Sequence, residues 1–191
     1  GAPILFHPGQ YINILLDDGA KRSFSFATAP RVSDEIELHV RLVKGGRFTP
    51  GVFSTMQIGD KLRFEGPLGA FTLREDSMKP IIFVAGATGF APVKSMLEHA
   101  FQSGLKRDMI LYWGVRSRHD LYLGALAEQW AHEHSNFHFI PVLSEPQPDD
   151  KWTGRTGLVH EAILVDFPDL SAYQVYACGS VQMVQAAYPA F

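Results

Sequence analysis

The stretch 81–96, IIFVAGATGFAPVKSM, divides the chain and decides its fold. Its first five residues form an apolar run rich in β-branched side chains, which predicts a short buried strand. A turn with two glycines follows, GATGFAP at 86–92, and the apolar spacing over 93–100 predicts a helix. A strand, a glycine turn and a helix in this order bring backbone N–H groups and a helix N-terminus up to a phosphate or a flat ring.

The segments after this turn alternate between strand-like and helix-like patterns. The strand-like segments are 109–115, 137–143 and 173–178, and the helix-like segments are 93–102, 121–134 and 157–165. This alternation predicts a parallel sheet wound in right-handed βαβ units. Ligands of such sheets bind beyond the carboxyl ends of the strands, where Gly86, Gly114 and Cys178 all stand.

The segments before the turn have a different character. The strand-like segments are 11–16, 21–28, 35–43 and 61–65, and 49–57 is a candidate short helix. Short strands separated by glycine and proline, with little helix, indicate an antiparallel barrel. We therefore predict two domains, residues 1–78 and residues 79–191.

Composition excludes several classes of protein. The chain has 191 residues, 46% hydrophobic and 19% charged, which is enough for two small domains with real cores. A net charge of −3 leaves no basic footprint for nucleic acid, and no apolar run is long enough to span a membrane. Cys178 is the only cysteine, so the chain alone can build neither a disulfide nor a cysteine-ligated iron–sulfur centre, and we expect a cytoplasmic location.

Two stretches of the first half carry chemically useful side chains. RSFS at 22–25 places a guanidinium, an aromatic ring and hydroxyls on one predicted strand, with Arg22 and Phe24 on the same face. Taken alone, this stretch is better interpreted as an exposed strand with a core phenylalanine. GGRFT at 45–49 is either a β-turn or a cradle for a phosphate.

Taken together, these motifs resemble those of the ferredoxin–NADP reductase-like superfamily. RSFS at 22–25 resembles its flavin motif R-x-[YF]-[ST], and GRFT at 46–49 resembles its pyrophosphate motif G-x-x-[ST]. GATGFAP at 86–92 does not fit G-x-G-x-x-G, but it resembles the superfamily's nicotinamide turn, and CGSVQM at 178–183 resembles its C-G-[PS]-x-x-M. The motifs occur in family order over nearly the whole chain. They are most similar to the NADH-linked reductases of bacterial oxygenases and of CDP-6-deoxy-glucoseen metabolism.

The resemblance implies an antiparallel Greek-key β-barrel that binds FAD, with FMN as an alternative, followed by an α/β parallel-sheet nucleotide-binding domain. Arg22 would neutralise the flavin diphosphate, Phe24 would lie along the isoalloxazine, and Ser25 would hydrogen-bond near flavin N5. The family usually has tyrosine at the position of Phe24, so the ring is kept and a hydroxyl is lost. Further flavin contacts are implied for Ser23, His39, Val40, Arg41, Gly46, Arg47, Phe48 and Thr49.

In the second domain the resemblance implies a site for NAD. Thr88 would contact the nicotinamide end, and the backbones of Gly86 and Gly89 would approach the diphosphate. Cys178 would lie beside nicotinamide C4, although a lone cysteine at a strand end is more often a buried small apolar residue. Further contacts with the nucleotide are implied for Pro92, Gly114, Arg116, Gly179 and Met183.

Three further residues bear on the choice of nucleotide. Relatives that prefer NADPH often have Ser-Arg after the third strand, where this chain has Ser-Glu-Pro at 144–146. A carboxylate at Glu145 would repel a 2′-phosphate, which favours NADH, while Arg116 and Arg118 keep NADPH open as an alternative.

Two further polar positions near this segment have simpler interpretations. Asp120 either belongs to the ribose site or caps the next helix. His132 and His134 do not face each other on a helix, and we predict no metal site.

The implied activity is that of an oxidoreductase. A hydride would pass from NADH to bound FAD beside Ser25 and Cys178, and single electrons would then pass to a [2Fe-2S] centre serving an oxygenase or a deoxysugar dehydratase. Because the chain lacks the cysteines, that centre must lie on a fused domain or on a partner protein. One alternative is an NAD(P)H:flavin or quinone reductase without an iron–sulfur partner. Another is a non-catalytic nucleotide-binding module that regulates a partner.

The opening residues GAPILFHPGQY enter in the middle of a strand pattern. We therefore expect the chain to be part of a longer protein. A first barrel strand would precede Gly1, and a C-terminal segment with an aromatic residue that covers the flavin would follow Phe191.

Overall fold

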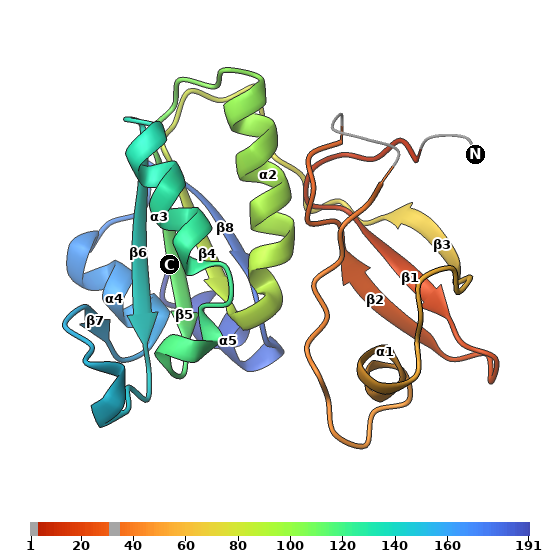
Figure 1. Cartoon of the computed structure of the whole chain (residues 1–191). Helices are drawn as coiled ribbons and strands as arrows, with labels where there is room; N and C mark the ends of the chain where they lie inside the picture. Colours follow the sequence, from red (N-terminus) through yellow and green to blue (C-terminus); the bar gives the residue numbers. More distant parts are fainter. Residues whose placement is uncertain (1–3, 31–34) are drawn as a thin grey trace.

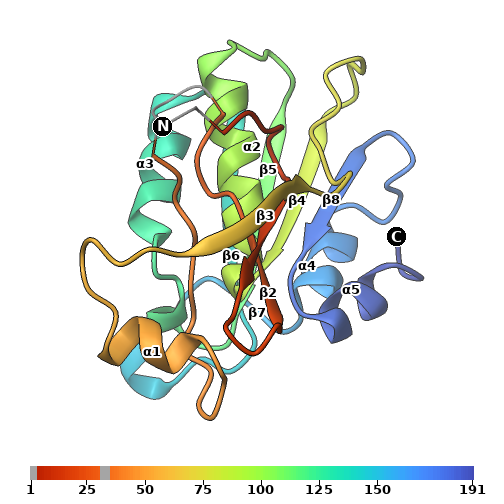
Figure 2. The same cartoon turned by 90° about the vertical axis from the view of Figure 1, so that its right-hand side faces the viewer.

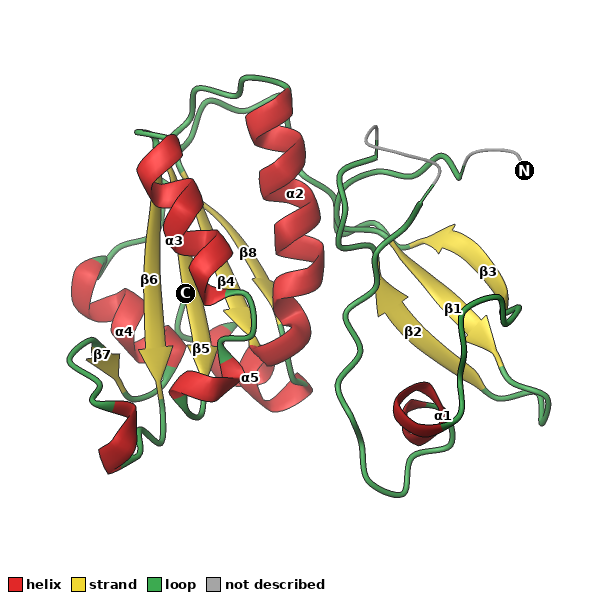
Figure 3. Cartoon of the chain, in the orientation of Figure 1, coloured by secondary structure: helices red, strands yellow, loops and turns green. Residues whose placement is uncertain are grey.

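The structure, a computed structural model, describes residues 4–30 and 35–191. It consists of an antiparallel sheet with one short helix and a parallel sheet with helices on both faces, and the two parts pack side by side (Figure 1). Figure 3 separates the strands and helices of the two parts by colour. The predicted architecture, antiparallel strands followed by a wound parallel sheet, is confirmed.

The antiparallel sheet has the strand order β2-β1-β3. Its part of the chain contains β1 (Tyr11–Leu15), β2 (Lys21–Ser25), α1 (Thr49–Ser54) and β3 (Arg63–Leu68). The central strand β1 buries Ile12 and Ile14 in a small core with Phe26 and Phe48. Gly19, at φ +79°, makes the turn from β1 to β2, because its left-handed backbone is one that glycine adopts at little cost. This core holds β2, the strand of the predicted flavin motif, in place.

The predicted strand at 35–43 is wrong. In the described part of the chain its pairing with the sheet is limited to an isolated bridge between Leu38 and Phe26, in which the amide of Ala27 donates to the carbonyl of Glu37 at 2.9 Å. The alternation in this segment does not reflect the two faces of a sheet. Instead, the side chains of Glu37 and His39 reach across to the parallel part of the molecule.

The parallel sheet has the strand order β7-β6-β5-β4-β8. Its strands are β4 (Ile81–Gly86), β5 (Met109–Val115), β6 (Phe137–Leu143), β7 (Arg155–Thr156) and β8 (Gln174–Cys178). The first five residues of β4 are fully buried, as expected for a central parallel strand covered on both faces. Alternate β4 side chains enter two different cores, with Phe83 in one and Val84 in the other.

Helices cover both faces of this sheet. They are α2 (Phe90–Gln102), α3 (Gly124–Glu133), α4 (Val159–Asp166) and α5 (Val181–Ala187). Short helical turns follow strands: η1 (Ala87–Gly89) after β4, η2 (Arg118–Asp120) after β5 and η3 (Pro148–Asp150) after β6. In Figure 1, α2 and α3 lie in front of the sheet and α4 and α5 behind it. The predicted strands and helices of this part are confirmed, while β7 was missed because two exposed residues carry no periodicity.

Helix α2 is the helix of the parallel part that lies next to the antiparallel part (Figures 1 and 2). It follows the glycine turn directly and is buried along nearly its whole length. None of the described helices has the length and apolar composition needed to cross a bilayer.

Candidate functional site

The three predicted strand ends meet at the carboxyl edge of the parallel sheet. Gly86, the last residue of β4, is in register with Gly114 of β5, and the preceding Ala85 is in register with Cys178 of β8. The turns that follow these strands therefore leave the sheet at the same level. The sequence prediction that they share one edge is confirmed.

The glycine turn after β4 has a constrained backbone. Ala87 lies at φ +47°, a left-handed conformation that costs a residue with a Cβ about 1 kcal/mol. The indole Nε1 of Trp113 donates a hydrogen bond to the carbonyl of Ala87 at 3.0 Å. Trp113 is fully buried and stacks on Phe90, with ring centroids 4.0 Å apart. A buried tryptophan on β5 thus holds the turn in place, a role that the sequence did not reveal.

The glycines of this edge allow two backbones to touch. A Cβ on Gly89 would lie 2.1 Å from the carbonyl oxygen of Cys178, and a Cβ on Gly86 would lie 2.5 Å from the sulfur of Met183. A Cβ on Gly179 would in turn lie 2.7 Å from the terminal methyl group of Met183. The motifs 86–92 and 178–183 therefore form one packed unit, with Met183 as its apolar contact.

Cys178 is partly buried at the end of β8. Burial raises the pKa of its thiol, so the group stays protonated near neutral pH. A protonated thiol at this place suits a contact that orients a flat ring, and it does not suit a nucleophile.

The segment after β5 is held by its own side chains. The hydroxyl and the amide of Ser117 both donate to Asp120, at 3.0 and 3.1 Å, so Asp120 closes the turn η2 from its third position. The interpretation of Asp120 as the cap of the next helix is wrong, because α3 begins after Leu123 without a side-chain cap. Arg116 is largely exposed, and its Nε lies 3.8 Å from a carboxylate oxygen of Glu145. A Cβ on Gly114 would lie 2.7 Å from the Cβ of Val159, so Gly114 allows α4 to pack closely on the face of the sheet.

The predicted flavin motif lies on β2 and partly contributes to the small core. Phe24 and Phe48 are neighbours, with ring centroids 5.5 Å apart. Arg22 donates from Nη1 to the carbonyl of Lys21 at 2.7 Å, and Ser23 donates to Asn13 at 2.7 Å. Ser25, half-buried at the end of β2, is in register with Tyr11 of β1.

The loop 43–49 is closed by hydrogen bonds before α1 begins. The amide of Gly46 donates to the carbonyl of Val43 at 2.9 Å, and the hydroxyl of Thr49 accepts from the amide of Val43 at 2.9 Å. The guanidinium of Arg47 binds Asp18 at 2.8 Å. The pKa of Asp18 is lowered by the hydrogen bond from the amide of Ala20 and by the charges of Arg47 and Arg22.

The cations present can accommodate an FAD diphosphate, which would compete with Asp18 for them. The guanidinium groups of Arg22 and Arg47 lie near one another at Asp18, and the loop closed by the hydroxyl of Thr49 leads into α1. The neighbouring rings of Phe24 and Phe48 supply the apolar surface that a flat ring needs.

His39 has a role that its sequence did not suggest. Its Nε2 lies 2.6 Å from Glu37, and its Nδ1 lies 2.6 Å from the hydroxyl of Tyr122 in the parallel part. Burial lowers the pKa of this imidazole, so it is neutral near pH 7, with Nε2 donating to the carboxylate and Nδ1 accepting from the tyrosine. The side chain of His39 therefore bridges the two parts of the molecule, whereas Arg41 is exposed.

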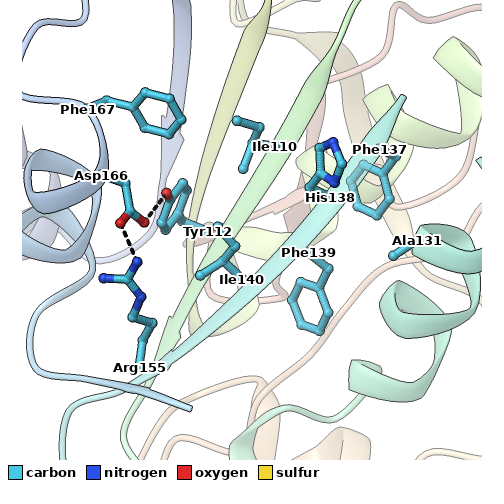
Figure 4. Close-up of a pocket in the computed structure, with 10 residues that line it drawn as sticks. All are labelled: Ile110, Tyr112, Ala131, Phe137, His138, Phe139, Ile140, Arg155, Asp166 and Phe167. Carbon is cyan, nitrogen blue, oxygen red and sulfur yellow. Dashed lines mark hydrogen bonds and ion pairs between the residues drawn. The ribbon is translucent and has the colours of Figure 1, made fainter. Parts of the chain in front are cut away.

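A separate hollow of about 490 Å³ lies along β6 (Figure 4). Apolar side chains such as Phe139 and Ile140 line it, and at one side the hydroxyl of Tyr112 donates to Asp166 at 2.7 Å while Arg155 pairs with the same carboxylate. None of the predicted site residues lines this hollow, so the candidate site remains at the carboxyl edge of the sheet.

Comparison with known families agrees with this arrangement. Residues 2–73 match the family described as "Oxidoreductase FAD-binding domain", and residues 83–188 match "Oxidoreductase NAD-binding domain". The chain is 47% identical over 186 residues to the CDP-6-deoxy-L-threo-D-glycero-4-hexulose-3-dehydrase reductase of Yersinia pestis, covering 97% of the chain and 55% of that protein. It is 34% identical over 194 residues to the NAD(P)H-flavin reductase of Aliivibrio fischeri, covering 99% of the chain and 81% of that protein.

A solved structure shows the same fold. The cytochrome P450 reductase GcoB of Amycolatopsis superposes with a TM-score of 0.91 at 35% identity, covering 100% of the chain and 58% of GcoB. The chain thus spans little more than half the length of GcoB and of the Yersinia protein.

Proposed function

Because the chain belongs to the ferredoxin reductase family of FAD- and NAD-binding oxidoreductases, we propose that it oxidises NADH and passes the electrons through bound FAD to a [2Fe-2S] centre. The centre would serve an oxygenase or a deoxysugar dehydratase. Bound FAD would supply two-electron acceptance and one-electron release, and the protein would supply binding and orientation.

The convergence of Gly86, Gly114 and Cys178 at one sheet edge carries this proposal. A nucleotide that lies along this edge can meet all three turns at once. In the proposed assignment, residues 79–191 hold NADH, with Thr88 and Cys178 at the nicotinamide end. Residues 1–78 hold FAD, with Arg22 and Thr49 at the diphosphate and Phe24 and Ser25 along the ring.

NADH is the coenzyme that the ribose end favours. Glu145 places a carboxylate next to Arg116, so it repels a 2′-phosphate and partly neutralises the cation that would attract one. Arg118 is engaged with Asp150, because its Nη1 donates to the Asp150 carbonyl at 3.2 Å. Neither arginine is therefore free of a competing acceptor.

The electron acceptor is proposed to be an iron–sulfur domain or protein. The Yersinia relative is named as the reductase of a dehydrase, and GcoB as the reductase of a cytochrome P450. A [2Fe-2S] cluster takes four cysteine ligands, and this chain has one cysteine, so the cluster would lie on another domain or partner. A cytoplasmic location is proposed, since NADH is supplied there and Cys178 is a free thiol.

The absorption spectrum tests the proposed function. We expect the purified protein to show flavin bands at about 370 and 450 nm, and we expect NADH to bleach them under anaerobic conditions faster than NADPH does. A colourless protein that cannot be loaded with FAD, or a loaded protein that NADH does not bleach, would contradict the proposal.

The same preparation separates the alternative functions. A free-flavin reductase, which the Aliivibrio relative favours, would lose its flavin on gel filtration after each turnover. A regulatory module would bind NADH without bleaching any flavin. The proposed reductase keeps its flavin through repeated cycles of reduction and reoxidation by a one-electron acceptor.

Cys178→Ala is expected to slow hydride transfer while FAD stays bound. The thiol is partly buried at the nicotinamide end, and its loss leaves the ring less well oriented. We expect the limiting rate of bleaching to fall about tenfold, which corresponds to about 1.4 kcal/mol in the barrier. Stopped-flow absorbance measures this rate. Cys178→Ser should retain more of it, and an unchanged rate in the alanine variant would exclude this role.

A further inference from the structure

Three consecutive residues of the antiparallel part are each held by α2. The ammonium of Lys94 donates to the carbonyl of Ala27 at 2.9 Å, and the hydroxyl of Ser95 donates to the carbonyl of Thr28 at 2.6 Å. The amide of Ala29 donates to Glu98 at 3.1 Å. We call these six residues, Ala27, Thr28, Ala29, Lys94, Ser95 and Glu98, the α2 clamp.

Lys94 is the centre of the α2 clamp. Its side chain is only 6% exposed, which is unusual for a lysine. The three donors of its ammonium group have three oxygen partners, namely the Ala27 carbonyl, Glu98 at 2.6 Å and Glu37 at 3.3 Å. Two of these partners belong to the antiparallel part and one belongs to α2 itself, so the buried cation joins the two parts.

A second bridge reinforces the first. Glu37 binds Lys94 through one oxygen and His39 through the other, and His39 continues to the hydroxyl of Tyr122. Tyr122 packs edge-on against Trp113, with ring centroids 5.2 Å apart. Because Trp113 also holds the carbonyl of Ala87, a chain of hydrogen bonds with one ring contact leads from Lys94 to the glycine turn of the proposed nicotinamide site.

The α2 clamp lies beside both proposed cofactor motifs. Ala27 follows Ser25 by two residues, and Lys94 follows Pro92 by two residues. No flexible segment separates the clamp from either motif, because Phe26 is fully buried on one side and α2 begins at Phe90 on the other. A shift at the clamp therefore moves the proposed flavin strand relative to the proposed nicotinamide turn.

Burial of a paired charge is not needed to hold two such surfaces together. Apolar residues of similar volume often give equal or greater stability. Charged hydrogen bonds differ because they fix one geometry, and hydride transfer is sensitive to displacements of about 1 Å.

We propose that Lys94 is a positioning residue for hydride transfer, which fixes the nicotinamide turn relative to the flavin strand through the α2 clamp. This inference rests on the proposed function. Lys94 touches neither reacting ring in this assignment and acts through Ala27 and α2.

The test replaces Lys94 in the FAD-loaded protein. We compare Lys94→Met, the double variant Lys94→Met with Glu98→Gln, and Lys106→Met, which makes the same change at an exposed lysine just beyond α2. The double variant removes the cation together with its nearest carboxylate, so it remains interpretable if the single variant does not fold. Lys94→Arg, which keeps the charge, tests for rescue.

Three quantities are measured: FAD content, the dependence of the bleaching rate on NADH, and amide hydrogen exchange of Ala29 in the cofactor-free protein. We expect FAD content and half-saturating NADH to stay within about twofold, the limiting rate to fall between about tenfold and a hundredfold, and Ala29 to exchange at least about tenfold faster. Lys94→Arg should recover part of the limiting rate, and Lys106→Met should match the parent in all three quantities.

Several results would overturn the inference. A limiting rate per bound FAD within twofold of the parent in Lys94→Met and in the double variant would reduce the clamp to a purely structural contact. An unchanged exchange rate of Ala29 would show that Lys94 does not hold this segment. If NADH fails to bleach the parent protein itself, the proposed function fails and the inference fails with it, whereas normal bleaching of both parent and variants contradicts the inference alone.

Discussion

Gly89→Ala is expected to destabilise the protein and to weaken its binding of NADH. The new Cβ would lie 2.1 Å from the carbonyl oxygen of Cys178 and 2.8 Å from the Cα of Gly179. Both neighbours are backbone atoms at the end of β8, so no side chain can rotate away. The backbone of Gly89 itself, at φ −60°, suits alanine, so the whole effect comes from lack of space.

We expect the free energy of unfolding to fall by about 3 kcal/mol, as for a severe overpacking substitution. Half-saturating NADH should rise by at least about tenfold, because the turn must move away from the edge where Gly86 and Cys178 meet. Urea unfolding gives the first quantity, and the NADH dependence of flavin bleaching gives the second.

Gly51→Ala is the matched control. Gly51 lies in α1, and the nearest atom to its new Cβ would be the hydroxyl oxygen of Thr55 at 3.7 Å, an ordinary contact. This variant should be unchanged or more stable by about 0.5–1 kcal/mol, because alanine is a better helix former than glycine. If Gly89→Ala is as stable as Gly51→Ala, the two motifs do not touch as described.

Sequence predicted the parallel part of this fold well, for a physical reason. Strands such as Ile81–Gly86 and Met109–Val115 are buried on both faces, so they appear as continuous apolar runs with sharp ends. Their carboxyl ends then follow from the connectivity alone, which is why the shared edge of Gly86, Gly114 and Cys178 could be predicted.

The antiparallel part was harder to predict, because some of its residues contact the parallel part instead of a neighbouring strand. The segment 35–43 alternates like a strand, yet Glu37 and His39 are polar because they bind Lys94 and Tyr122 of the other part. Periodicity records which side chains are polar and not what they face. An interface between two domains therefore resembles the exposed face of a sheet when only sequence is read.

In the candidate site, the sequence likewise predicted the motifs but not the residues that hold them in place. Short motifs predicted the turns, but the residues that hold them are ordinary core residues in sequence. Trp113 sits in an apolar strand, and nothing local indicates that its indole binds the Ala87 carbonyl. Lys94 looks like a surface lysine of an amphipathic helix until the contact with Ala27 becomes visible. Contacts between residues more than twenty positions apart need the three-dimensional structure.

The second large effect is expected at Arg107, whose side chain joins the linker between the two parts to the parallel sheet. Arg107 is 4% exposed. Its Nε donates to the carbonyl of Lys79 and its Nη1 to the carbonyl of Arg74 at 2.7 Å, both in the segment that enters β4. Its Nη2 donates to the side chain of Gln174, the first residue of β8. One buried side chain thus binds three acceptors on two segments through part-buried hydrogen bonds.

Arg107→Met should lower the free energy of unfolding by at least about 3 kcal/mol, because each acceptor left without a donor costs about 1 kcal/mol or more. Arg107→Lys should lose less, since an ammonium group can reach some of the same acceptors but lacks the planar fork that spans them. Arg63→Met is the control: Arg63 is 73% exposed and pairs with Asp17 at 3.4 Å, so its loss should change stability by less than about 0.5 kcal/mol. Urea unfolding of the three variants gives the free energies of unfolding to be compared. An Arg107→Met protein as stable as Arg63→Met would mean that the linker holds its place without this side chain, and the relative position of the two parts would then depend on the α2 clamp.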